Sequence, residues 1–174
     1  GGRVALHFAT QFSHLLQGLV LFGANPGIRE EQVRDERVRW EEQLCQRLQD
    51  DGVEGFLKYW QSLPIIETQK RIADEIWLPM QERRLLSTRE GLIQSLRNMG
   101  TGRMASLWDA LENINCPVLY CAGQEDEKYC RIGQEVVERL PRGQFMALPG
   151  AGHAAHLEAL EASGEVVRNW YERL

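Results

Sequence analysis

The fold is decided by the stretch Val118-Leu119-Tyr120-Cys121-Ala122-Gly123-Gln124-Glu125-Asp126 and by its counterpart Gln144-Phe145-Met146-Ala147-Leu148-Pro149-Gly150-Ala151-Gly152-His153. In each stretch a short apolar run ends in a turn rich in glycine or proline, which is typical of a strand within a sheet. Asp126 and His153 lie 27 positions apart. That distance leaves room for one crossover helix and one strand, so we expect the two strands to be parallel.

The residues on either side continue this alternation of helices and strands. Residues 3–17 carry apolar side chains at helical spacing, and Gly18 ends the pattern. A continuous apolar run follows over 19–24, as expected for a strand covered on both faces of a parallel sheet. Further helices are predicted over 104–113, 129–140 and 155–173. The order predicts an α/β fold with a parallel sheet and right-handed crossovers.

The middle of the chain contains no convincing strand. Charged and amphipathic patterns indicate helices over 29–50, 53–62, 67–86 and 89–99, with Pro64 and Pro79 as interruptions. We therefore expect a core formed by residues 1–28 and 104–174, into which a helical cap of residues 29–103 is inserted. The core then has only three strands, too few for a stable sheet that is covered on both faces.

Composition excludes several classes of protein. The formal net charge is −5, and without a basic surface we expect no nucleic-acid partner. No apolar run approaches the ~20 residues that a membrane span requires, and no signal peptide is visible. The four cysteines form no C-x-x-C pair, which removes the common zinc and redox sites. We expect a reduced, cytoplasmic protein that needs no metal and no cofactor.

Asp126 and His153 are the candidate catalytic pair. In open parallel sheets the active site lies beyond the carboxyl ends of the strands, and both residues follow a predicted strand directly. A carboxylate there can accept a hydrogen bond from the imidazole, fix its tautomer and stabilise its cation. Taken singly, Asp126 reads as a turn former and His153 as a structural loop residue. The pair, in the order acid then histidine, is the order of an α/β-hydrolase, in which the serine comes first.

Several segments together resemble one family of this fold. They are Gly1-Gly2-Arg3-Val4-Ala5-Leu6, Asn25-Pro26-Gly27, Gly100-Thr101-Gly102-Arg103, Gly123-Gln124-Glu125-Asp126-Glu127-Lys128-Tyr129 and Gly152-His153-Ala154-Ala155-His156-Leu157-Glu158. With these segments the chain resembles the 2-succinyl-6-hydroxy-2,4-cyclohexadiene-1-carboxylate synthases of menaquinone and phylloquinone biosynthesis. The resemblance covers the whole chain, including the cap, and implies an α/β-hydrolase fold with a helical cap.

The resemblance also implies an activity and a set of site residues. It implies a lyase in which Asp126 is the triad acid and His153 the base that acts on a succinyl side chain, after which pyruvate is eliminated. The substrate carries several carboxylates, which arginines bind. Arg3 occupies the place of an arginine that follows the nucleophile turn, and Arg37, Trp60 and Arg84 fall where the cap supplies two arginines and a tryptophan. Arginine suits this role because its planar fork holds a carboxylate with two hydrogen bonds.

Structural interpretations of these residues remain open. Arg37 lies in a charged run that could be a solvated helix face. The neighbouring Arg83 could take the place of Arg84, and Trp60 could belong to the core of the cap.

The triad serine is the main departure from the family pattern. The resemblance places it two positions before Gly1, in a nucleophile turn, and Ser13, Ser62, Ser87 and Ser106 do not lie in such a turn. We therefore expect the N-terminal strands and the serine to be supplied by another segment or chain. The alternatives are another α/β-hydrolase, such as an esterase, thioesterase or carbon–carbon bond hydrolase, or a non-catalytic interaction module that retains part of the fold.

Overall fold

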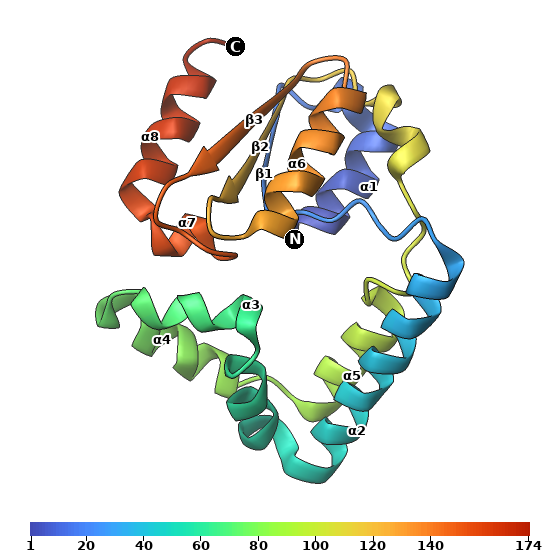
Figure 1. Ribbon diagram of the computed structural model, residues 1–174, viewed down its shortest axis with the longest axis vertical. Coiled ribbons are helices and arrows are strands. Elements are labelled where there is room, and N and C mark those ends of the chain that lie inside the picture. Colours follow the sequence, from blue (N-terminus) through green and yellow to red (C-terminus); the bar gives the residue numbers. More distant parts are fainter. The chain divides into compact units, whose positions relative to one another are not determined.

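Three strands form one parallel sheet, as the sequence predicts. The computed structural model describes residues 1–174. In it β1 (Leu19–Phe22), β2 (Val118–Gly123) and β3 (Gly143–Leu148) lie in the order β1-β2-β3. Both pairs are parallel, with Leu19 opposite Val118 and Cys121 opposite Met146. Because β2 is the central strand, its residues are buried on both faces (Figure 1).

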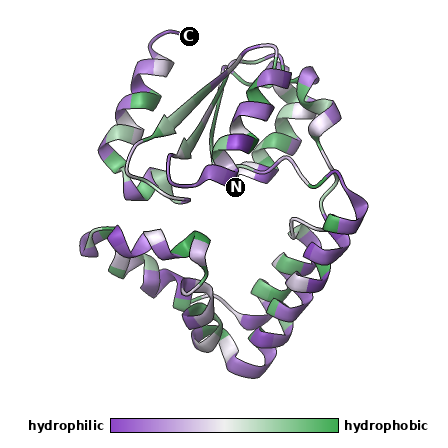
Figure 2. Cartoon of the chain, viewed as in Figure 1, coloured by the Kyte–Doolittle hydropathy of each residue, from purple (hydrophilic) through white to green (hydrophobic).

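Helices cover both faces of this sheet. One face is covered by α1 (Gly2–Phe12) and α6 (Glu127–Arg139), and the other by α7 (Ala155–Glu158) and α8 (Leu160–Tyr171) (Figure 1). Hydrophobic residues run along the strands between these layers (Figure 2). Alternate residues of β2 serve opposite faces: Leu119 packs toward α8, whereas the ring of Tyr120 lies against α6 at Gly133. The Tyr120 hydroxyl donates to the carbonyl of Ala24 at 2.6 Å, which holds the end of β1.

The start of α1 lies beside the chain that leaves β1. A Cβ at Gly2 would come within 2.7 Å of the Cβ of Ala24, closer than two carbon atoms approach. Leu6 and Ala9 then bury their side chains completely. The helix ends at Phe12, a short 3₁₀ turn follows over Ser13–Leu15, and β1 begins after Gly18.

The helix predicted over 104–113 is shorter than expected. Only the 3₁₀ segment η3 (Trp108–Asn113) forms. The amide of Leu107 donates to the carbonyl of Pro26 at 2.7 Å, so it is unavailable for a helical bond to the fourth residue before it. A contact with a distant segment therefore overrides the local helical pattern.

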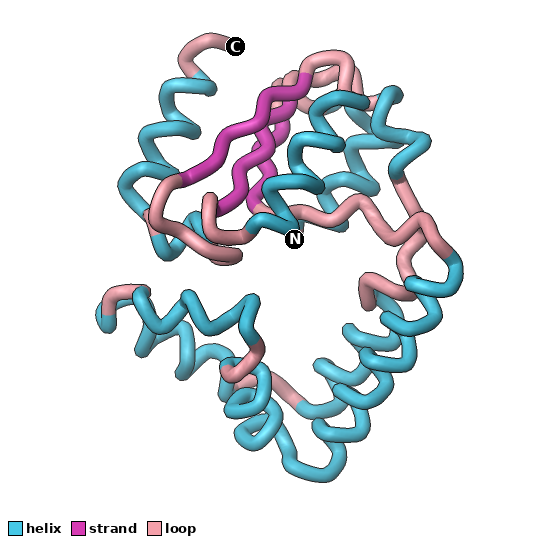
Figure 3. Tube along the Cα trace, in the orientation of Figure 1, coloured by secondary structure: helices cyan, strands magenta, loops and turns pink.

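A second compact unit is entirely helical. It comprises residues 27–67 and 72–106, whereas residues 68–71 belong with 1–26 and 107–174 in the unit that contains the sheet. Its helices are α2 (Glu31–Gln61), α3 (Pro64–Glu67), α4 (Asp74–Leu85) and α5 (Arg89–Met99), and the 3₁₀ segment η2 (Thr68–Arg71) interrupts them (Figure 3). The chain holds no helix that combines the length and the apolar character needed to span a membrane.

The predicted boundary between helices 29–50 and 53–62 is confirmed, because α2 is interrupted by a kink at Gly52, whose backbone is non-helical with φ 67°. Pro79 lies inside α4, although a helix break was predicted there. Proline removes one hydrogen bond to the carbonyl four residues earlier, and that local loss does not stop the helix.

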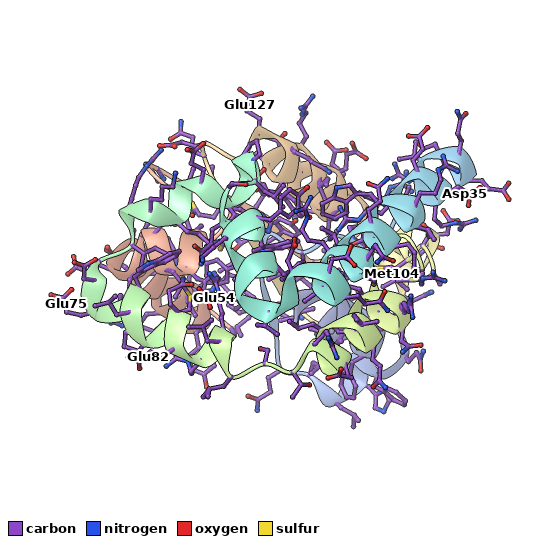
Figure 4. All side chains as sticks on the ribbon, turned by 90° about the horizontal axis from the view of Figure 1, so that it is seen from below. Asp35, Glu54, Glu75, Glu82, Met104 and Glu127 are labelled. Carbon is purple, nitrogen blue, oxygen red and sulfur yellow. The ribbon has the colours of Figure 1, made fainter.

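Helix α2 packs on α5 through an apolar core that includes Leu44, Leu48 and Phe56. Acidic side chains on the outside, such as Asp35 in α2, Glu75 in α4 and Glu127 in α6, are exposed and project outward from their helices (Figure 4). The helices are therefore amphipathic, as their charged sequences predict.

Glu41 is the exception among the acidic residues of α2, because its side chain is buried. It accepts hydrogen bonds from the amides of Thr101 at 2.7 Å and Gly102 at 3.3 Å, and from Nε of Arg37 at 2.8 Å. A Cβ at Gly100 would overlap the Glu41 carboxylate. The glycines around Thr101 thus let the loop close around a buried carboxylate.

We predict that Glu41→Ala lowers the free energy of unfolding by about 2–4 kcal/mol, because buried amides lose their acceptor and Arg37 loses its partner. Urea unfolding followed by circular dichroism measures the change. The matched control is Glu54→Ala on the same helix, whose pair with Lys58 is exposed, and which should change the stability by less than about 1 kcal/mol. Equal effects of the two substitutions would contradict this assignment.

Candidate active site

The turn after β2 holds Asp126 in place from two sides. Its amide donates to the carbonyl of Gly123 at 3.0 Å, and its Oδ1 accepts from the amide of Tyr129 at 3.1 Å. Asp126 is therefore the N-cap of α6, a position that favours a short acidic side chain. The residue is only 9% exposed. Its second oxygen, Oδ2, remains available for another partner.

The turn after β3 is bonded directly to the turn after β2. The amide of Gln124 donates to the carbonyl of Leu148 at 2.9 Å, and the amide of Glu125 donates to the carbonyl of Ala151 at 3.0 Å. A Cβ at Gly123 would overlap the carbonyl oxygens of Ala151 and Gly152. Glycine is thus required at the end of β2 for the two turns to approach this closely.

This arrangement brings Asp126 and His153 together. Nδ1 of His153 lies 2.8 Å from Oδ2 of Asp126. An ionised carboxylate can only accept, so Nδ1 carries the proton in this hydrogen bond and Nε2 keeps a free lone pair. The side chain of His153 is 27% exposed and that of Asp126 is 7% exposed. The pair thus combines a sheltered acid with an accessible base.

Two further residues surround the His153 ring. The ring of Tyr129 lies 4.6 Å from it, centroid to centroid. Gly23, at the end of β1, adopts φ 53°, and a Cβ there would lie 3.3 Å from Cε1 of His153. The imidazole therefore lies among the ends of all three strands and the first turn of α6, with 27% of the side chain exposed. Neither Tyr129 nor Gly23 had been assigned a role from the sequence, since no local pattern indicates a contact with His153.

The thiols near the sheet do not supply a nucleophile. Cys130 donates its S–H to the carbonyl of Gly123 at 3.2 Å, and burial raises the pKa of this thiol. Burial also raises the pKa of Cys121 to about 12. Both thiols therefore stay protonated at neutral pH, and only a thiolate is a strong nucleophile. No serine of residues 1–174 hydrogen-bonds to His153, and no cluster of three metal-ligating side chains is present.

Two of the candidate substrate-binding residues share a pocket inside the helical unit. Trp60 and Arg84 line a cavity of about 220 Å³. Its remaining walls are Phe56, Leu57, Ser87, Leu92, Ser95 and Leu96. Burial lowers the pKa of Arg84, whereas Arg83 is exposed. Of these two arginines it is Arg84 that reaches the pocket.

Arg37 and Arg3 lie elsewhere. Arg37 does not line the pocket: its Nε bonds to Glu41 and its guanidinium lies 4.3 Å from the centre of the Trp40 ring. Trp40 in turn lies 6.4 Å from Trp60, ring to ring. Arg37 therefore has a structural role as the counter-ion of a buried carboxylate. Arg3 is partly exposed in the first turn of α1, in the unit that holds the sheet.

Comparison with known proteins shows which fold the chain has and which proteins it resembles. No protein-family model matches the chain. A putative 2-succinyl-6-hydroxy-2,4-cyclohexadiene-1-carboxylate synthase from Bacillus subtilis (strain 168) is 38% identical over 167 residues, which cover 96% of this chain and 61% of that protein. The structure of MenH from S. aureus matches with a TM-score of 0.94 and 29% identity, and covers 99% of this chain and 65% of that chain.

A more distant structure shows the fold alone. A thermophilic esterase from Thermogutta terrifontis matches with a TM-score of 0.78 and 24% identity, over 99% of this chain and 61% of that chain. The chain has the α/β-hydrolase fold. Within that fold it resembles the 2-succinyl-6-hydroxy-2,4-cyclohexadiene-1-carboxylate synthases over nearly its whole length. The matched part spans about three fifths of the Bacillus subtilis relative, 61% of its length.

We predict that Gly23→Ala lowers the free energy of unfolding by about 1–2 kcal/mol, because alanine strains the left-handed backbone. It also brings a methyl group against the His153 ring. Gly164→Ala is the matched control: that glycine is exposed in α8, with open space around it. This control should stabilise the protein by roughly 0.5–1 kcal/mol. Thermal unfolding of both variants tests the opposite signs, and stabilisation by Gly23→Ala would refute the close approach.

Proposed function

We propose that this chain carries the acid and the base of a lyase that eliminates pyruvate from a succinyl-bearing hydroxycyclohexene carboxylate in menaquinone or phylloquinone biosynthesis. The observation that carries the proposal is the 2.8 Å hydrogen bond between Nδ1 of His153 and Oδ2 of Asp126 at the ends of adjacent parallel strands. The similarity to the Bacillus subtilis synthase and to MenH supports this choice among the activities of the fold.

In the proposed reaction His153 acts as the general base. Its Nε2 has the free lone pair, so it accepts the proton that is removed from the succinyl side chain. The imidazole then becomes a cation, and the buried carboxylate of Asp126 stabilises that charge through Nδ1. The negative charge left on the substrate expels the group that leaves as pyruvate.

A complete triad also needs a serine. The resemblance places that serine two positions before Gly1, just ahead of α1. The packing around Gly2 supports this position: Gly2 lies against Ala24, and the neighbouring Gly23 lies against the His153 ring. A side chain just ahead of α1 therefore starts close to the base. Amide groups at the start of a helix also favour an anion there.

For the substrate we propose a molecule with several carboxylates, bound by Arg3, Arg37, Trp60 and Arg84. On this proposal the helical segment 29–103 is the substrate-binding cap. Support comes from the pocket in which Arg84 and Trp60 meet, since it offers one cation within largely apolar walls. An apolar surround strengthens the attraction of a carboxylate, because little water competes with it. The structural bond of Arg37 to Glu41 makes Arg37 the weakest member of this set.

We predict that His153→Ala and Asp126→Asn both abolish most of the activity. In the natural gene product that contains these residues, Asp126→Asn should lower kcat by about 10²–10⁴-fold, because the amide no longer fixes the tautomer. Pyruvate release from the authentic succinyl substrate, coupled to lactate dehydrogenase, measures the rate. Glu127→Gln, beside Asp126 and exposed, is the control that should keep the wild-type rate.

The same assay separates the lyase from its main rival. A neutral ester substrate is added in a parallel reaction. Ester hydrolysis that depends on His153, without any pyruvate release, would replace the lyase by an esterase. Neither reaction in the wild-type protein would favour the non-catalytic module.

We predict that Arg84→Ala raises KM for the polycarboxylate substrate by roughly 10–100-fold, the loss expected for one charge-assisted hydrogen bond. Its kcat should change less, because on this proposal the residue binds the substrate and takes no part in the proton transfer. Arg83→Ala is the matched control, since Arg83 is the exposed neighbour on α4. Unchanged KM in Arg84→Ala, or equal effects in both variants, would remove Arg84 from the binding site.

A further inference from the structure

The carboxylate of Glu158 accepts hydrogen bonds from the main chain on both sides of His153. Oε2 accepts a hydrogen bond from the amide of Gly152 at 2.8 Å, and Oε1 accepts one from the amide of Ala154 at 3.0 Å. Glu158 is the last residue of α7, whose first residue is Ala155. The Glu158 carboxylate thus links the end of α7 back to the segment that carries His153 and leads into this helix. Nothing in the proposed reaction requires Glu158 to touch the substrate.

These two hydrogen bonds restrain the backbone of His153, which the other contacts of the residue leave free. Asp126 fixes the direction of Nδ1 and Tyr129 contacts the ring. Those contacts act on the side chain and do not by themselves hold the backbone from which it projects. Two bonds to the flanking amides restrain that backbone, so they set where Nε2 lies. Charge-assisted hydrogen bonds are short and strong, which suits this role.

Thr68 holds the carboxylate in turn. Its Oγ1 donates to Oε1 of Glu158 at 3.0 Å. A Cβ at Gly152 would overlap the Thr68 side chain, so glycine at 152 is what allows this approach. Thr68 opens the segment η2, which belongs to the unit with the sheet although its chain neighbours on both sides belong to the helical unit. Arg71, at the other end of η2, makes a bidentate pair with Glu125 in the acid turn at 2.8 and 2.7 Å.

We propose that Glu158 is a positioning residue for His153 and that Thr68 orients the Glu158 carboxylate, so that η2 of the insertion helps to set the geometry of the base. The inference rests on the proposed function only in its kinetic part, since the position of the imidazole can be observed without any substrate. A positioning residue affects the rate because it sets the distance between the catalytic group and the substrate. Misplacement of a catalytic group by about 1 Å can lower the rate ~100-fold.

The test uses Glu158→Gln in the natural gene product. Glutamine keeps the size of the side chain, but its NH₂ group faces one of the two amides instead of accepting from it. We expect kcat for pyruvate release to fall by roughly 10–100-fold, as for other residues that orient a catalytic group, with KM nearly unchanged. We also expect the low-field NMR signal of the His153 Nδ1 proton to shift or broaden, because the imidazole no longer holds one position against Asp126.

Thr68→Val gives a second, milder test. It removes the hydroxyl donor while the carboxylate stays, so it remains informative if Glu158→Gln does not fold. Here kcat should fall less than in Glu158→Gln, and the Nδ1 proton signal should shift in the same direction. Glu161→Gln is the matched control: it makes the same chemical change at an exposed position in the first turn of α8. It should leave both kcat and the imidazole signal as in the wild type.

The outcomes separate the two proposals. An unchanged His153 signal in both Glu158→Gln and Thr68→Val overturns the positioning role, even if the variants are less stable. Lack of pyruvate release by the wild-type protein overturns the proposed function instead, and the NMR comparison still decides the role of Glu158.

Discussion

Parallel pairing of β2 with β3 is the constraint from which the geometry of the site follows. Because the strands are in register and run the same way, their turns leave the sheet side by side, and the backbone bonds from Gln124 and Glu125 lock those turns together. Only then can a short aspartate side chain reach the imidazole across the edge of the sheet. Glycine at 123 is part of the same constraint, since any side chain there would push the turns apart.

Acidic side chains that accept hydrogen bonds from main-chain amides recur through the molecule. Asp126 holds the first turn of α6, Glu158 holds the segment around His153, and Glu41 holds the loop at Thr101. In each place a carboxylate accepts hydrogen bonds from main-chain amides, and at Glu41 the absence of a side chain on Gly100 leaves room for it. These hydrogen bonds hold irregular segments in place, which a catalytic pair on turns requires.

Much of this could be predicted from the sequence, because strands and helices leave local patterns. The apolar runs at 118–122 and 144–148 and the turns after them were enough to place Asp126 and His153 at neighbouring strand ends. Long-range contacts leave no such pattern. The hydrogen bond from Leu107 to Pro26 shortens a predicted helix. Arg37, a candidate substrate-binding residue, pairs with the buried carboxylate of Glu41. The hydrogen bond of Thr68 to Glu158 also has no counterpart in any local sequence pattern.

The position of η2 has a consequence for protein engineering. A domain that is inserted at a single place can be exchanged by cutting the chain twice, once at each junction. Here the helical unit leaves the other unit after Pro26, returns to it for residues 68–71, and rejoins it only at Leu107. A chimera that swaps this unit between related enzymes therefore has four junctions to respect rather than two. A chimera that carries a foreign sequence through residues 68–71 would replace Thr68 and Arg71 together with the intended helices. It would thereby change the residues that contact Glu158 and Glu125 in the unit with the sheet.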